Sequence, residues 1–69
     1  MTKAETIKGY MASRRRYILG DNSSRETAVT LRNILLDKLH VPALEVILID
    51  KAVDDSISLA DIRRGVYYG

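Results

Sequence analysis

The fold of this chain is decided by residues 42–53, which read PALEVILIDKAV. Residues 43–49 could form a buried strand, because they are rich in β-branched side chains. A lone strand would leave its backbone N–H and C=O groups unpaired, however, and no second strand pattern exists to pair with it. Pro42 suits the first position of a helix, where its missing N–H would have no partner anyway. We therefore predict a helix over residues 42–53.

Other helix starts are marked by a hydroxyl residue followed three positions later by an acid. The hydroxyl can accept a hydrogen bond from the first helical turn, and the acid suits the positive end of the helix dipole. The three pairs are Thr2 with Glu5, Ser23 with Glu26, and Ser58 with Asp61. Residues 20–22, Gly-Asp-Asn, are typical of a turn. We predict an all-α fold, a compact bundle of three to four short helices in a single small domain spanning residues 1–69. The expected helices cover about 3–19, 24–39, 42–53 and 59–67.

Helical projection at about 100° per residue assigns an apolar face to each predicted helix. The first face consists of Ala4, Ile7, Met11 and Ile18, flanked by Tyr10 and Tyr17. The second consists of Ala28, Leu31, Leu35 and Leu39, and the third of Val46, Ile49 and Val53. The last helix would bury Leu59, Ile62 and Val66. Because Phe and Trp are absent, the core is expected to be mainly aliphatic.

The second and third helices also carry a surplus apolar face. The residues concerned are Val29, Leu36, Leu44, Ile47 and Leu48. They could pack internally if the helix at 42–53 were the central element, and otherwise they would form an exposed patch of the kind that marks interfaces. A dimer would also relieve the marginal stability of so small a core. We predict a small non-enzymatic regulator or adaptor that binds a protein partner or a second copy of itself through this surplus.

Charge is unevenly distributed along the chain, although the net charge is only +2. Residues 1–36 carry seven basic and three acidic side chains, whereas residues 37–62 carry two basic and six acidic ones. Such asymmetry suits either charge pairing between neighbouring helices or subunits, or a nucleic-acid-binding face.

The run Arg14-Arg15-Arg16 is the feature most suggestive of nucleic-acid binding. Consecutive helical residues point about 100° apart, so the three side chains cannot form one patch. We expect Arg14 to pair with an acid such as Asp50 or Asp54, and the other two arginines to be solvated. The alternative function is a nucleic-acid-binding regulator resembling a helix-turn-helix protein. Its candidate contacts are Arg14, Arg15, Arg16, Arg63 and Arg64, with Tyr17, Tyr67 and Tyr68 for stacking.

Composition argues against several other classes of protein. The chain has no cysteine, and therefore neither a disulfide framework nor a cysteine-based zinc site. His40 is the only histidine and is expected to serve as a cation at a helix end. The acids between Asp50 and Asp61 lack the spacing of a calcium loop. There is no glycine-rich phosphate loop, so we expect no catalysis, cofactor or metal. No apolar run resembles a signal peptide or membrane span, which predicts a cytoplasmic protein.

Overall fold

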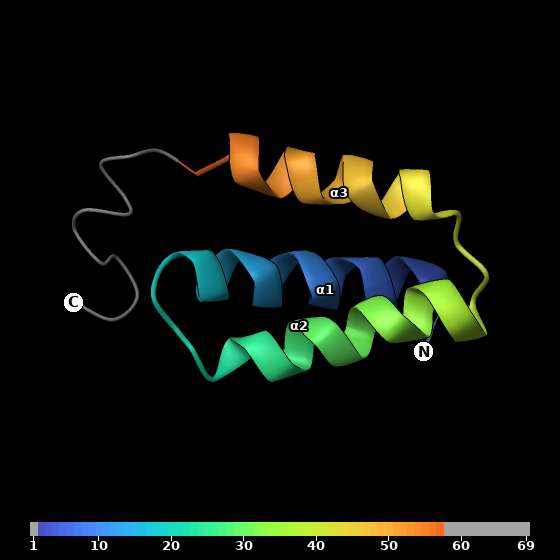
Figure 1. Cartoon of the computed structure of the whole chain (residues 1–69), viewed down its shortest axis with the longest axis horizontal. Helices are drawn as coiled ribbons and strands as arrows, with labels where there is room; N and C mark the ends of the chain where they lie inside the picture. Colours follow the sequence, from blue (N-terminus) through green and yellow to red (C-terminus); the bar gives the residue numbers. More distant parts are fainter. Residues whose placement is uncertain (1, 58–69) are drawn as a thin grey trace.

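The computed structural model describes residues 2–57, and the regular secondary structure within them is entirely helical (Figure 1). The elements are α1 (Lys3–Ile18), α2 (Ser24–Asn33), the π-helical turn η1 (Ile34–Lys38) that continues α2, and α3 (Ala43–Asp55). This arrangement confirms the all-α bundle and the choice of a helix for residues 42–53. The predicted helix at 59–67 lies outside the described residues.

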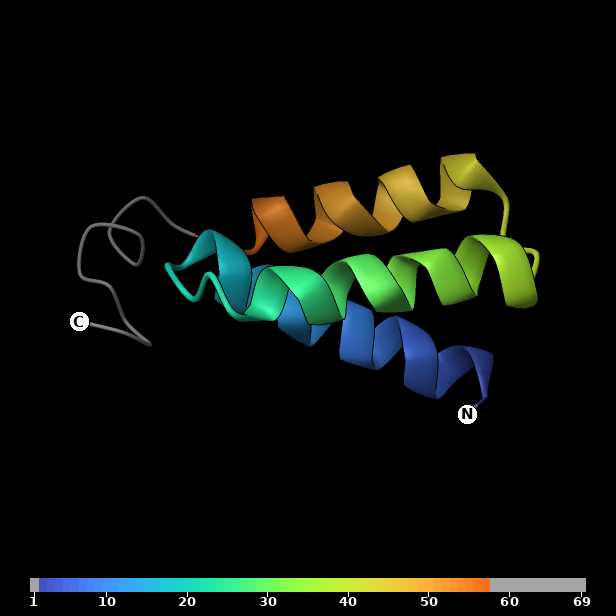
Figure 2. The same ribbon diagram turned by 60° about the horizontal axis from the view of Figure 1, so that its bottom comes forward.

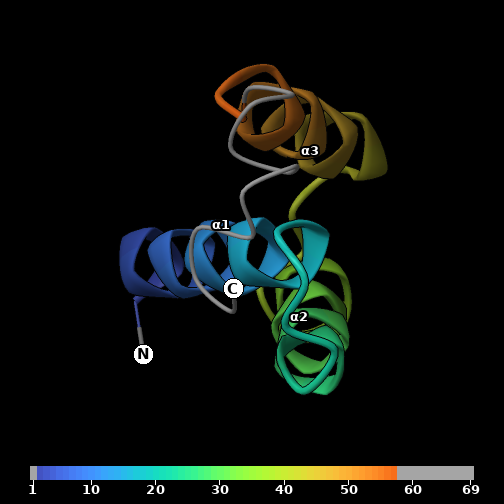
Figure 3. The ribbon, with the colours of Figure 1, turned by 90° about the vertical axis from the view of Figure 1, so that its left-hand side faces the viewer.

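Helix α1 is the central element of the described bundle. It packs against both α2 and α3, whereas α3 reaches the second helix chiefly through η1. The three helices run roughly side by side (Figure 2), and the end-on view places α1 between α3 and α2 (Figure 3). The buried side chains of the core are Tyr10, Ala28, Leu35, Val41 and Val46. Because α1 rather than α3 is central, α3 keeps one side that no described helix covers.

The apolar faces predicted for the second and third helices are confirmed. Leu35 in η1 and Val46 in α3 are completely buried, with exposed fractions of 0%. Ala28 and Val53 are also buried, and the side chains of Leu31, Leu39 and Ile49 pack half-buried against the same core. Periodicity sufficed here because each of these helices needs only one face toward α1.

The face predicted for α1 is wrong in its centre. Thr6 and Tyr10 are its most buried residues, whereas Ala4 is exposed. Both buried side chains are polar, but their hydroxyls have partners: Thr6 donates to the Thr2 carbonyl at 2.8 Å, and Tyr10 donates to Asp50. A buried hydroxyl with a partner costs little. Since α1 packs against two helices, it buries a broader face than the single stripe of Ala4, Ile7, Met11 and Ile18.

The capping box predicted at the start of α1 is confirmed. The backbone N–H of Glu5 donates to the Thr2 hydroxyl at 3.1 Å, and the Thr2 N–H donates to the Glu5 carboxylate at 3.2 Å. Two backbone donors of the helix end are thereby satisfied. The predicted pair Ser58 and Asp61 lies outside the described residues.

The capping box predicted at Ser23 is wrong. Ser23 already has helical backbone angles, and its side chain makes no capping hydrogen bond. Asp21 takes over this role, because its carboxylate accepts from the Ser23 N–H at 3.1 Å and from the hydroxyls of Ser23 and Ser24. An aspartate two residues ahead competes for the same donor through an Asx turn.

Replacing Thr2 and Ser23 by alanine, one at a time, should show which of the two predicted caps stabilises its helix. We expect Thr2→Ala to lower the free energy of unfolding by about 1 kcal/mol, because it leaves the Glu5 N–H without its acceptor. Ser23→Ala should lower it by less than half as much, since only an exposed contact to Asp21 is lost. Urea unfolding followed by circular dichroism measures both values. Equal decreases in the free energy of unfolding would mean that the Thr2 capping box stabilises the protein no more than the Ser23 side chain does.

The C-terminal ends of α1 and η1 are each followed by a residue with positive φ. Gly20 has a φ of 119°, which lets its N–H donate to the Tyr17 carbonyl at 3.1 Å and the Asp21 N–H to the Arg16 carbonyl at 2.9 Å. This is a Schellman motif, and it confirms the predicted break after α1. His40, with a φ of 52°, follows the π turn, and the next N–H, that of Val41, donates to the Leu35 carbonyl at 2.8 Å.

The third helix begins one residue later than predicted. Pro42 has extended backbone angles and serves as the N-cap of α3, so Ala43 is the first helical residue.

Candidate protein-interaction site

The first half of α3 is apolar on the side that faces away from the core, and the second half of that side carries the exposed Lys51 and Asp55. Leu44, Ile47 and Leu48 have exposed fractions of 67%, 54% and 58%. Their spacings of three and four residues place them on adjacent turns of one helical face. We call these three residues the outer α3 face. Most large aliphatic side chains of small domains are buried, so three neighbouring exposed ones are typical of an interaction surface.

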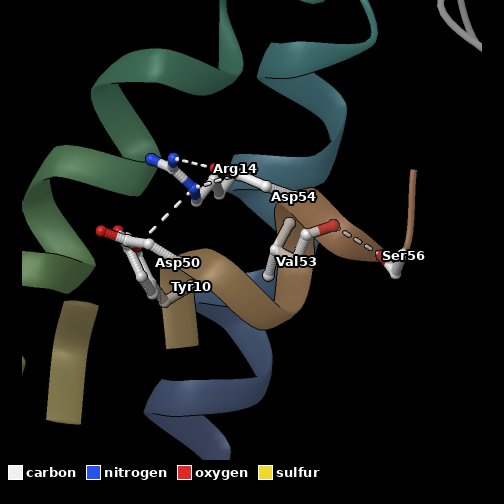
Figure 4. Close-up of polar contacts among 6 residues, drawn as sticks. All are labelled: Tyr10, Arg14, Asp50, Val53, Asp54 and Ser56. Carbon is white, nitrogen blue, oxygen red and sulfur yellow. Dashed lines mark hydrogen bonds and ion pairs between the residues drawn. The ribbon is translucent and has the colours of Figure 1, made fainter. Parts of the chain in front are cut away.

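The orientation of α3 is fixed by a polar network with α1 (Figure 4). Arg14 of α1 holds Asp54 through two hydrogen bonds of 3.2 Å from Nε and Nη2, and lies 3.6 Å from the Asp50 carboxylate. The hydroxyl of Tyr10 donates to the same Asp50. These contacts turn the acidic side of α3 toward α1. Leu44 and Leu48 lie on the side of α3 opposite the buried Val46 and Val53. Ile47 lies at the edge of that side, since it is seven residues, about two helical turns, before Asp54.

Burial and pairing shift the pKa values in this network. Burial, helped by the hydrogen bond to Asp50 and its negative charge, raises the pKa of Tyr10 to about 12. For Arg14, burial alone would lower the pKa, but the hydrogen bond to Asp54 and the charges of both aspartates outweigh it and raise the pKa. Tyr10 therefore stays neutral and Arg14 stays charged in the folded protein at neutral pH.

The raised pKa of Tyr10 makes stability depend on pH at the alkaline end. The pKa is higher in the folded chain than its ordinary value of 10.0, so this contribution is fully present below pH 10 and is lost as the pH rises toward 12. We expect the unfolding free energy of the wild type to fall more steeply in this window than that of Tyr10→Phe, which has no phenol to ionise. At neutral pH, Tyr10→Phe should cost about 1 kcal/mol for the lost hydrogen bond. Parallel slopes for the two proteins would contradict this account.

The other predicted interface residues do not join the outer α3 face. Val29 is 48% exposed, but it lies on α2 beside a groove between α1 and α2. Leu36 is half-buried and packs against the core. It lies in η1, whose wider turns change the angular relation that an ideal helix would give to residues 29 and 36. The five predicted interface residues are therefore divided between different surfaces.

The arginine run is spread around α1, as expected from helical geometry. Arg14 pairs with Asp50 and Asp54, which confirms the predicted pairing. Arg15 is not simply solvated as predicted, because its Nη1 donates to the Ser56 hydroxyl at 2.9 Å.

Arg16 is exposed, and Tyr17 is 39% exposed. The remaining nucleic-acid candidates, Arg63, Arg64, Tyr67 and Tyr68, lie outside the described residues.

Comparisons of the chain with protein-family models, curated proteins and solved structures gave no match. Among the helices within residues 2–57, none combines the length and the apolar character needed to cross a membrane.

Proposed function

We propose that this chain is a small non-enzymatic interaction module, a regulator or adaptor, that forms a homodimer through the outer α3 face. The observation that carries the proposal is that the exposed fractions of Leu44, Ile47 and Leu48 are each above one half. Covering side chains of this size contributes about 1 kcal/mol or more apiece. The gain does not require α3 to change its packing, because Val46 and Val53 already hold its other side to the core.

A second copy of the chain suits this face because Lys51 and Asp55 would each have a favourable neighbour in an antiparallel pair. If the two-fold axis passes between Ile47 and Leu48, Leu44 of one copy faces Lys51 of the other. A lysine stem can cover an apolar side chain while its ammonium group stays in water. Asp55 then lies near the N-terminal end of the partner's α3, where the helix dipole favours negative charge. Lys51 and Asp55 are both exposed and available for these roles.

Self-association through α3 also fits an adaptor. The groove between α1 and α2 lies on a different part of the surface from the outer α3 face, so it stays open on both copies. A dimer would therefore present two identical binding surfaces, and paired surfaces raise the effective affinity for a repeated or dimeric target.

Sedimentation equilibrium over a wide range of protein concentrations tests the proposal. A three-residue apolar face makes a small interface, so we expect a monomer–dimer equilibrium with a dissociation constant of roughly 10–100 µM. Concentration-dependent NMR shifts should be confined to α3. A strict monomer at about 1 mM, or shifts confined to α1 and α2, would overturn the proposed dimer.

A further inference from the structure

A groove lined by arginines lies between α1 and α2, apart from the outer α3 face. Three arginines line a groove of about 120 Å³: Arg14 from α1, and Arg25 and Arg32 from α2. Tyr17 and Val29 form apolar parts of the same wall. The groove has space because Ala28, the α2 residue at its base, has a short side chain.

The groove is electropositive. Arg14 is already paired with Asp50 and Asp54 through its Nε and Nη2 atoms. Arg25 and Arg32 are exposed, and within residues 2–57 neither has a carboxylate in ion-pair distance. Two arginines seven residues apart on α2 therefore line the groove without a carboxylate at ion-pair distance within residues 2–57. An anion bound between them would be attracted by both positive charges.

The shape of the groove indicates what kind of anion it would take. Guanidinium groups bind phosphate oxygens in a bidentate manner, and a phosphate monoester carries nearly two negative charges at pH 7. A volume of 120 Å³ is enough to hold a phosphoryl group. The exposed ring of Tyr17 offers a flat surface on which the rest of such a ligand could stack.

We propose that this groove binds a soluble phosphate monoester whose phosphoryl group lies between Arg25 and Arg32 and whose flat apolar part stacks on Tyr17. The site is independent of the proposed dimer, since it uses α1 and α2 and leaves the outer α3 face free. Phenyl phosphate is the matching probe, and inorganic phosphate tests the contribution of the aromatic part.

Titration with phenyl phosphate, followed by amide NMR shifts, tests the site. We expect saturable binding with a dissociation constant below about 10 mM, with the largest shifts at residues 25–32 and around Tyr17. Arg25→Gln and Arg32→Gln should each weaken binding by about tenfold or more, and inorganic phosphate should bind more weakly than the phenyl ester. Arg16→Gln is the matched control, because Arg16 is an exposed arginine of α1 outside the groove. Its affinity should equal that of the wild type.

The proposal is overturned if no saturable binding occurs, if Arg16→Gln weakens binding as much as Arg25→Gln, or if inorganic phosphate binds as tightly as the phenyl ester. The proposal is also overturned if a single-stranded oligonucleotide shifts the same amide signals and binds more tightly than phenyl phosphate, because the groove would then be a nucleic-acid site. Arg25 and Arg32 take part in no described ion pair, so their variants should fold normally, which circular dichroism verifies.

Discussion

Leu35→Ala is expected to lower the free energy of unfolding by about 2–5 kcal/mol. Leu35 has an exposed fraction of 0% and lies at the centre of the core, in the π turn between α2 and α3. Alanine would remove most of the side chain and leave a cavity that the surrounding helices cannot fully close. A chain of this length has a total stability of roughly 3–10 kcal/mol, so the loss is a large fraction of it and should lower the urea midpoint of unfolding markedly.

The matched control for this experiment is Leu48→Ala, the same chemical change at an exposed position on the outer α3 face. Leu48 is 58% exposed on α3, so its truncation leaves no cavity and should change monomer stability by less than about 0.5 kcal/mol. Both variants are compared by urea unfolding at low protein concentration, where association does not contribute. If Leu48→Ala were as damaging as Leu35→Ala, then α3 would not be oriented as described.

The sequence predicted α2 and α3 well because each of them has a single buried face. Apolar periodicity reports one such face directly, as it did for Leu35 and Val46. It failed for α1, whose buried residues Thr6 and Tyr10 are polar. Thr6 bonds a carbonyl one turn earlier in the chain, whereas Tyr10 depends on a partner that only the folded chain supplies. The partner of Tyr10 is Asp50, which lies forty residues away in the sequence.

Local competition and backbone irregularity limited the prediction elsewhere. A serine followed by glutamate predicts a capping box, but at Ser23 the preceding Asp21 satisfies the donors first. The π turn η1 has no recognised sequence signal, and it separates Leu36 from Val29. The arginine groove was missed because Arg25 and Arg32 are far from the conspicuous run at 14–16. Their seven-residue spacing, matched by that of Tyr10 and Tyr17, was the available signal.

The outer α3 face was predictable because α3 has more apolar residues than the core of a small bundle needs. A small bundle needs one apolar face from each helix, and α3 has two. What the sequence left open was which helix is central. Because α1 is central, Leu44, Ile47 and Leu48 are exposed. Of the two alternatives for these residues, internal packing or an exposed patch, the structure therefore has the exposed patch.

Ile47→Glu is expected to raise the dissociation constant of the proposed dimer by about a hundredfold or more. In a two-fold pair centred between residues 47 and 48, the new carboxylate lies close to its own copy in the partner. Like charges that face each other in a desolvated interface cost several kcal/mol. The monomer should tolerate the change, since Ile47 is 54% exposed. Val29→Glu is the matched control: Val29 is similarly exposed on α2, and its substitution should leave the dimer intact if α3 alone forms the interface.

Mixing two variants provides the sharper test, because it distinguishes a specific two-fold interface from nonspecific association of apolar surfaces. Ile47→Lys alone should dissociate for the same reason as Ile47→Glu. Combined in equal amounts, the two variants should form a heterodimer in which the opposite charges meet, and sedimentation should recover a mass of two chains. A mixture that stays monomeric would show that residue 47 of one copy does not approach residue 47 of the other. In that case the pairing of α3 with itself would be wrong, even if the wild type associates.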